Sequence, residues 1–130
     1  LIYLKLHIYQ TQLVTTELAR LNNHFTKGGL IVGDNAEPRL IAEIRAKGFN
    51  IVPCTKGADS IRNSIDTLQQ QKLFITAKST NAIKEAYNYR WATDSTGKNI
   101  NVPEDRHNHF WDSVRYVALN RLKKSTFFIQ

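Results

Sequence analysis

Short apolar segments alternate with amphipathic segments along the chain, and this order constrains the fold more than any other feature of the sequence. Over residues 1–9, apolar residues at even positions alternate with polar or aromatic ones, which is the two-residue period of a β-strand. Further apolar runs predict buried strands at residues 30–32, 49–53 and 73–75. Because helical patterns lie between these runs, the sequence predicts an α/β fold with parallel crossovers in its middle units.

Five helices are predicted between or after these strands. Thr15 or Thr16 is a suitable N-cap for the first, which extends to about residue 25 with Leu18, Leu21 and Phe25 on one face. The other four cover residues 38–47, 57–71, 79–87 and 109–123. The polar stretch between the last two, residues 92–107, is expected to be a long loop or a hairpin.

The composition is that of one basic globular domain. The 130 residues include 18 Lys and Arg against 11 Asp and Glu, so the formal net charge is +7. A basic surplus of this size favours polyanionic partners such as nucleic acid. The single cysteine, Cys54, excludes an internal disulfide, fits a reducing compartment and is expected to be a buried apolar residue. The apolar runs are far shorter than the ~20 residues that span a bilayer, which excludes a transmembrane helix.

Two segments carry candidate acidic and histidine residues. Asp34 follows the strand at residues 30–32, at the carboxyl end where functional residues collect in open α/β sheets, and Glu37 begins the next helix. His109 and Asp112 lie three residues apart, so they share one face of the last helix. Each has a structural alternative. Asp34 would be a turn cap and Glu37 a complement to the helix dipole. Asp112 would face solvent, and His109 would be a structural histidine.

A basic, glycine-containing helix start begins at Lys56. Lys56 and Arg62 are candidates for phosphate contacts there, and the alternative is a solvated basic turn. Base stacking is an option for three aromatic residues, although their spacing favours packing in the core: Tyr87, Tyr89 and Trp91.

Five segments, taken in order and spacing, resemble the C-terminal nuclease domain of phage terminase large subunits. They are residues 34–38 (DNAEP), 48–51 (GFNI), 56–61 (KGADSI), 88–91 (NYRW) and 108–116 (NHFWDSVRY). The resemblance implies a ribonuclease-H-like mixed sheet flanked by helices. It implies a metal-dependent endonuclease that cuts concatemeric double-stranded DNA during genome packaging. It also implies a location in the bacterial host cytoplasm and, as partners, the terminase ATPase domain, the portal and the small subunit.

The same resemblance assigns a metal site. Asp34 and Asp112 fall on acidic positions that bind Mg²⁺ or Mn²⁺, with two ions expected, and His109 falls on a helical histidine near them. Glu37 is a candidate for a further metal ligand. Hard cations of this kind prefer oxygen ligands. Two of them roughly 4 Å apart can activate a water and stabilise the leaving oxygen of a phosphodiester.

The family's first acidic residue lies on an opening strand that has no counterpart in this sequence. The chain also contains no methionine. We therefore expect a fragment: a nuclease domain over residues 1–124 that lacks its opening strand or strands, and a tail over residues 125–130. Two carboxylates rarely hold two cations, so the missing acidic residue bears on whether the fragment is active by itself.

Three other functions stay open on the sequence alone. The first is a non-catalytic module that binds DNA or the packaging assembly, which metal-independent DNA binding without nicking would favour. The second is another ribonuclease-H-like nuclease of the resolvase or transposase type, which a preference for branched DNA would favour. The third is a structural packaging component, which would bind neither metal nor DNA.

Overall fold

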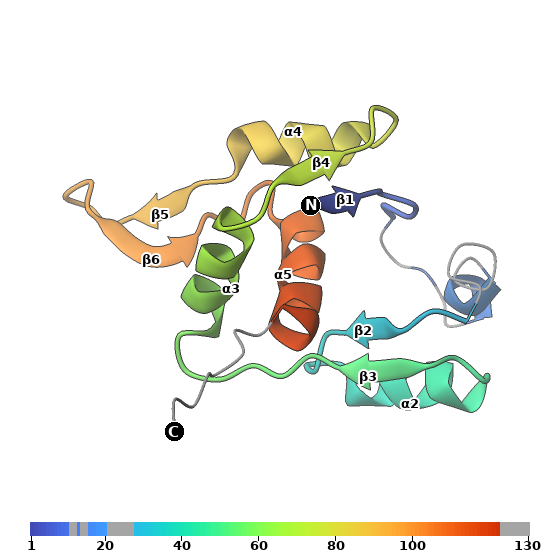
Figure 1. The fold of residues 1–130 in the computed structure, drawn as a ribbon. Helices are drawn as coiled ribbons and strands as arrows, with labels where there is room; N and C mark the ends of the chain where they lie inside the picture. Colours follow the sequence, from blue (N-terminus) through green and yellow to red (C-terminus); the bar gives the residue numbers. More distant parts are fainter. Residues whose placement is uncertain (11–12, 14–15, 21–27, 123–130) are drawn as a thin grey trace, which may run out of the picture.

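The computed structural model describes residues 1–10, 13, 16–20 and 28–122, and Figure 1 shows their arrangement. The elements are β1 (Ile2–Leu4), β2 (Ile31–Gly33), α2 (Pro38–Ala46), β3 (Ile51–Pro53), α3 (Ser60–Gln69), β4 (Leu73–Ile75), α4 (Thr80–Asn88), β5 (Trp91–Thr93), β6 (Asn99–Pro103) and α5 (His109–Arg121). Residues 16–20 are also helical, as predicted. The remainder of that predicted helix, with Leu21 and Phe25, lies outside the described residues, and so does the predicted tail.

The described strands form three two-stranded sheets. β1 pairs with β4 and β2 pairs with β3, both in parallel, whereas β5 and β6 form an antiparallel hairpin within the polar stretch. The mixed α/β class predicted from the sequence is therefore confirmed. The first strand is shorter than residues 1–9 because the Leu6 amide donates to the Ser79 hydroxyl (2.9 Å) instead of to a neighbouring strand.

The β2–α2–β3 unit is a parallel crossover built on a small apolar core. Proline opens α2, where its missing N–H costs nothing, and Gly48 follows the end of the helix with a φ of +93°. Between these ends, Ile41 and Ile44 are buried against Ile51 of β3. Burial of this helix face joins α2 to the strand pair and fixes the position of the end of β2.

Helix α5 lies centrally, between the β1–β4 pair and the β2–β3 pair in Figure 1. It packs against α3, α4 and β2, and its residues Phe110, Arg115 and Ala118 are buried. Most of its other residues are half-buried, because neighbouring elements cover it on several sides. This position carries the middle of α5 to the end of β2.

Of two predictions about burial, the one for Cys54 is confirmed and the one for Tyr87 is wrong. Cys54 is 2% exposed, as expected, and its amide donates to the Gly33 carbonyl (2.7 Å), which ties the ends of β3 and β2 together. Placing Tyr87 in the core was wrong, because this side chain is 86% exposed. The buried side of α4 is formed by Ala82 and Glu85, and a residue two positions after Glu85 lies on the opposite side of a helix.

Within the described part of the chain, no helix is both long and apolar enough to cross a membrane.

Candidate active site

Asp34 stands directly after β2, and its carboxylate accepts hydrogen bonds from three segments. Oδ1 accepts from the Ala36 amide (3.0 Å) and from Lys56 Nζ (2.7 Å), while Oδ2 accepts from the Tyr116 hydroxyl (3.3 Å). The hydrogen bond from Lys56, assisted by the Ala36 amide, lowers the pKa of Asp34 below its ordinary value. Asp34 is therefore an ionised carboxylate at neutral pH, held in one orientation.

Gly33 explains how Asp34 comes so close to the core. A Cβ atom at this position would lie 3.2 Å from Ile41 Cγ1 and 3.3 Å from Ile51 Cδ1, which is tighter than ordinary contact. Glycine lets the last residue of β2 pack directly on α2 and β3. The chain then turns outward at Asp34, whose side chain is 40% exposed.

Lys56 reaches Asp34 because β2 and β3 are parallel neighbours, so the segments that follow them leave from the same edge. Its ammonium also lies 4.7 Å from the centre of the Tyr116 ring. The hydrogen bond to Asp34 raises the pKa of Lys56. Lys56 is thus already engaged by an acid and an aromatic ring, and its predicted contact with phosphate stays a prediction.

Asp112 lies in the first turn of α5 and forms an ion pair with Arg115 (2.5 Å). The Arg115 side chain is 7% exposed and that of Asp112 is 28% exposed. The structural alternative, in which Asp112 faces solvent fully, is therefore wrong. Its carboxylate is partly buried and oriented by a buried guanidinium.

Tyr116 contacts Asp34 from α5, the helix that also carries Asp112. It lies four residues after Asp112, which is about one turn of α5, and its hydroxyl donates to Asp34. Burial raises the pKa of Tyr116, and the negative charges of Asp34 and Asp112 raise it further against the opposing effect of Lys56. Both carboxylates therefore act on one phenol. The sequence did not single out Tyr116, although its spacing from Asp112 was an available signal.

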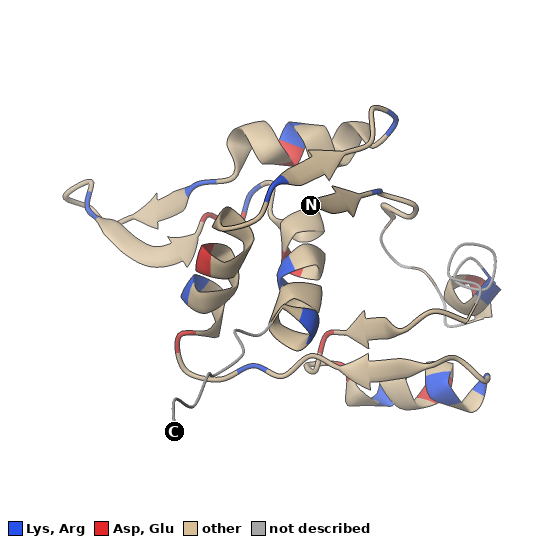
Figure 2. Cartoon of the chain, in the orientation of Figure 1, with Lys and Arg blue, Asp and Glu red and all other residues tan. Residues whose placement is uncertain are grey.

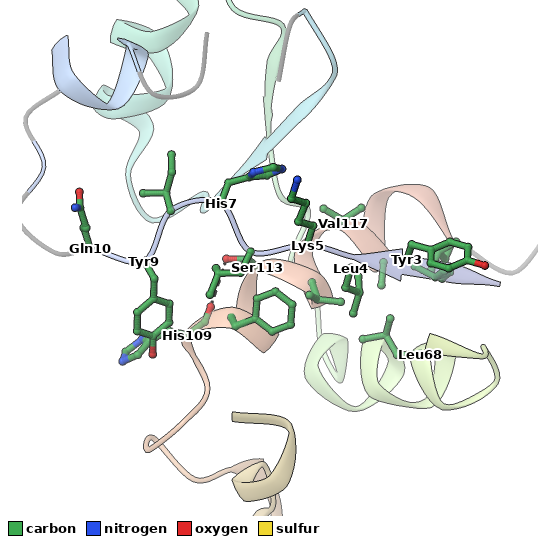
Figure 3. Close-up of a pocket in the computed structure, with 17 residues that line it drawn as sticks. Tyr3, Leu4, Lys5, His7, Tyr9, Gln10, Leu68, His109, Ser113 and Val117 are labelled. Carbon is green, nitrogen blue, oxygen red and sulfur yellow. Dashed lines mark hydrogen bonds between the residues drawn. The ribbon is translucent and has the colours of Figure 1, made fainter. Parts of the chain in front are cut away.

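His109 opens α5 and faces a different environment from Asp112. It lines a groove of about 1100 Å³ between the β1 segment and α5, together with Tyr9, Ser113 and Val117 (Figure 3). Its ring meets that of Tyr9 edge-on, with 6.5 Å between the ring centres. Asp112 does not line this groove. His109 and Asp112 are three residues apart on one helix, yet only His109 faces this groove.

Glu37 and Arg62 lie at the periphery. Glu37 is exposed at the start of α2, where its backbone amide donates to the Asp34 carbonyl (3.3 Å). The Arg62 guanidinium lies 4.0 Å from the Asp66 carboxylate on the exposed face of α3. The metal role of Glu37 and the phosphate role of Arg62 remain predictions.

The donor set suits a hard divalent cation with many bound waters. Mg²⁺ and similar ions are commonly held by one or two carboxylates while water fills the other positions, and Asp34 and Asp112 supply two. Both carboxylates are paired with basic side chains, so a cation has to compete with Lys56 and Arg115. Among residues 1–10, 13, 16–20 and 28–122, no group of three His, Cys, Asp or Glu side chains is arranged to hold a metal ion.

Basic residues lie on the helices and in the connecting segments, and the described strands carry none. Figure 2 shows Lys and Arg on α2, α3, α4 and α5 and in several connecting segments, with acidic residues among them. Lys56 and Arg115 are the basic residues that directly contact the two candidate aspartates.

A mixed α/β fold with an aspartate after a parallel strand and a second on the closing helix is that of a ribonuclease-H-like domain. Residues 1–119 match the family described as the terminase RNAseH-like domain, and the chain belongs to this family. The resemblance seen in the sequence motifs is confirmed.

Two relatives come from one phage. The chain is 29% identical over 114 residues to the terminase large subunit of Bacillus phage SPP1, an alignment that covers 85% of this chain and 26% of that protein. It also matches the crystal structure of the g2p (large terminase) nuclease domain from bacteriophage SPP1 with bound Mn. That match has a TM-score of 0.73 and 25% identity, and covers 82% of this chain and 63% of the other. The chain thus spans about a quarter of the length of the SPP1 large subunit.

Proposed function

We propose that this chain forms part of the nuclease domain of a terminase large subunit and hydrolyses phosphodiester bonds of double-stranded DNA with Mg²⁺ or Mn²⁺. The observation that carries the proposal is the hydrogen bond from Tyr116 to Asp34 at the end of β2, because it brings α5, the helix that carries Asp112 one turn before Tyr116, to that aspartate. Membership of the terminase family supports the reaction. The bound Mn in the similar SPP1 nuclease domain supports the choice of metal.

In this proposal, Asp34 and Asp112 hold the cation, and Glu37 is a candidate for a further ligand. When bound, a divalent cation polarises the phosphate and lowers the pKa of a coordinated water. The chain's own contribution is orientation: the Tyr116 hydroxyl holds Asp34 and Arg115 holds Asp112. Fixed carboxylates lose less entropy when they take up a ligand.

The basic residues and His109 have supporting roles in this proposal. Lys56 supplies positive charge beside Asp34, and Arg62 supplies it on α3, where both favour the approach of a DNA phosphate. His109, at the start of α5, is assigned to proton transfer or to a phosphate contact. Because basic side chains already occupy both aspartates, metal loading and DNA binding are coupled through Lys56 and Arg115.

The biological setting belongs to the same proposal. The SPP1 relative is a terminase large subunit, which supports a role in cutting concatemeric phage DNA during packaging in the bacterial host cytoplasm. An ATPase domain, the portal and the terminase small subunit are the proposed partners. The chain corresponds to a quarter of that relative, so these partners are assigned to the whole protein.

Calorimetric titration of Mn²⁺ tests the metal site. We expect Asp34→Asn and Asp112→Asn each to weaken Mn²⁺ binding at least about tenfold, because each removes a charged oxygen ligand. Asp66→Asn is the matched control, since Asp66 is an exposed helical aspartate paired with Arg62. Equal affinities in all four proteins would overturn the assignment of Asp34 and Asp112.

A non-catalytic DNA-binding module is the second candidate. It is favoured by the pairing of both aspartates with basic residues, and by the lack of a three-ligand group in the described part of the chain. Nicking of supercoiled plasmid in Mn²⁺ separates the two. Nicking that disappears in the Asp34→Asn, Asp112→Asn double variant supports the nuclease. DNA binding without metal, together with no nicking by any variant, supports the binding module.

A further inference from the structure

Glu85 is a charged residue in an environment where charge is costly. It lies on α4 and is 2% exposed, which places it among the largest fully buried side chains described. A buried carboxylate is tolerated only where hydrogen-bond donors replace the water it has lost. The donors around Glu85 therefore indicate what the residue does.

Three donors from two other segments converge on this carboxylate. Oε1 accepts from the Tyr9 hydroxyl (2.7 Å), and Oε2 accepts from the backbone amides of Phe110 (2.7 Å) and Trp111 (3.4 Å). Phe110 and Trp111 are the second and third residues of α5. Glu85 thus ties α4 to the segment after β1 and to the first turn of α5.

The two amides belong to the part of a helix that cannot bond to itself. The first four N–H groups of an α-helix have no partner within the helix, and a side chain at the N-cap commonly accepts one of them. Asn108, the N-cap of α5, makes no such side-chain bond. Glu85 supplies the acceptor from another helix, and its negative charge also suits the positive end of the helix dipole.

We propose that Glu85 is a positioning residue, whose carboxylate fixes the start of α5 and thereby sets where Asp112 and His109 stand relative to Asp34. The proposal rests on the proposed metal site for its functional consequence. The geometry that supports it does not depend on that site. Asp112 follows the anchored amide of Trp111 directly, and His109 packs edge-on against Tyr9, the third partner of Glu85.

The direct test is residue-resolved amide hydrogen exchange on the whole 130-residue chain. In Glu85→Ala, we expect exchange at Phe110 and Trp111 to accelerate at least about tenfold, while the Cys54 amide between β3 and β2 keeps its rate. Glu43→Ala is the control, because Glu43 is a glutamate of α2 whose side chain is 38% exposed and pairs with Arg39. Unchanged exchange at Phe110 and Trp111 in Glu85→Ala would overturn the proposal.

Two milder variants keep the test valid if Glu85→Ala does not fold. Glu85→Gln retains the shape and one oxygen acceptor but removes the charge, so exchange at the two amides should rise by a smaller factor. Tyr9→Phe removes the third donor and leaves the carboxylate on α5, so those amides should stay protected. If exchange at Phe110 and Trp111 rises in Tyr9→Phe as much as in Glu85→Gln, the proposal that Glu85 fixes the start of α5 through those two amides is contradicted.

A double-mutant cycle on Mn²⁺ affinity tests the functional consequence. Glu85→Gln should weaken Mn²⁺ binding several-fold in the wild-type background and have no further effect in Asp112→Asn, because it acts through Asp112. Equal effects in both backgrounds would show a structural role only. If wild type binds no Mn²⁺, the proposed metal site fails, while the exchange measurement still decides whether Glu85 anchors α5.

Discussion

Each acid at the candidate site faces a basic partner. Asp34 pairs with Lys56 and Asp112 pairs with Arg115, so the two carboxylates are neutralised before any ligand arrives. The pairs differ in exposure, because the side chains of Asp34 and Lys56 are 40% and 35% exposed whereas Arg115 is buried. Solvent screens the first pair more than the second. A cation therefore displaces Lys56 more readily than Arg115.

The Asp34–Lys56 pair makes stability depend on pH in a defined direction. Lys56 lowers the pKa of Asp34 in the folded state, so the stabilisation is present above the ordinary aspartate pKa of about 4 and is lost as the pH falls through the lower folded value. We expect Lys56→Met to cost about 0.5 kcal/mol at pH 7, because the pair is exposed. Urea unfolding at pH 7 and through the acid range measures the difference.

Lys78→Met, at an exposed lysine before α4, is the control for that series. The difference between wild type and Lys56→Met should begin to shrink below about pH 4, as the Asp34 carboxylate takes up its proton. A difference that is constant from pH 7 into the acid range would assign the effect to packing on Tyr116 rather than to the ion pair.

At the scale of single residues, the sequence predicted candidate site residues better than it predicted which residues they contact. Asp34 was identified because it ends an apolar run, which is a local signal. Its bond to Lys56 depends on β2 and β3 being parallel neighbours, so no local pattern contains it. Glu85 had no signal at all, because a charged residue in an amphipathic helix is ordinarily placed on the exposed side.

Among the elements, α2 shows how one residue ends a helix. Gly48 adopts a φ of +93°, its amide donates to the Arg45 carbonyl (2.9 Å), and the Lys47 amide donates to the Ile44 carbonyl (3.1 Å). The turn therefore satisfies carbonyl groups that the helix leaves free. It also directs the chain back into β3, which forms the parallel pair with β2.

Gly48→Ala should destabilise the chain by about 1 kcal/mol, because a Cβ atom is strained at this φ although the space around it is open. We expect Tm to fall by roughly 4 °C in thermal unfolding. Gly57→Ala is the matched control, since that glycine has open space and no positive φ. An equal loss in both variants would show that strain at Gly48 is not the cause.

Element type and order were predictable because apolar spacing is a direct record of which side of a strand or helix is buried. The pairing of strands was not. β1 has three residues and pairs with β4, a partner more than half the chain away, and nothing in three apolar residues specifies it. Tyr87 was misplaced for a related reason: spacing defines a helix face, and only the neighbouring element decides which face is covered.

For the whole molecule, the basic residues that give the net charge of +7 are distributed over the helices and the connecting segments (Figure 2). We expect the affinity for a random duplex to fall at least about tenfold between 50 and 200 mM KCl. Phosphate contacts release counterions from the DNA, and this release is less favourable at higher salt. Fluorescence anisotropy measures this dependence.

Lys56→Gln should reduce the slope of log affinity against log salt by about one, because it removes one phosphate contact. Arg39→Gln, on the exposed side of α2 where Arg39 pairs with Glu43, should leave the slope unchanged. The same slope for wild type and Lys56→Gln would remove Lys56 from the DNA-binding surface.

The buried Cys54 makes motion at the candidate site measurable by simple chemistry. It is the only cysteine in the sequence, and burial both hides the thiol and raises its pKa, which leaves little reactive thiolate. A thiol reagent can label it only when the joined ends of β2 and β3 separate, so the labelling rate reports how often they open. Because Asp34 follows β2 directly, a ligand bound there should slow the labelling. The wild-type chain thus contains its own reporter of that opening, with no dye or substitution required.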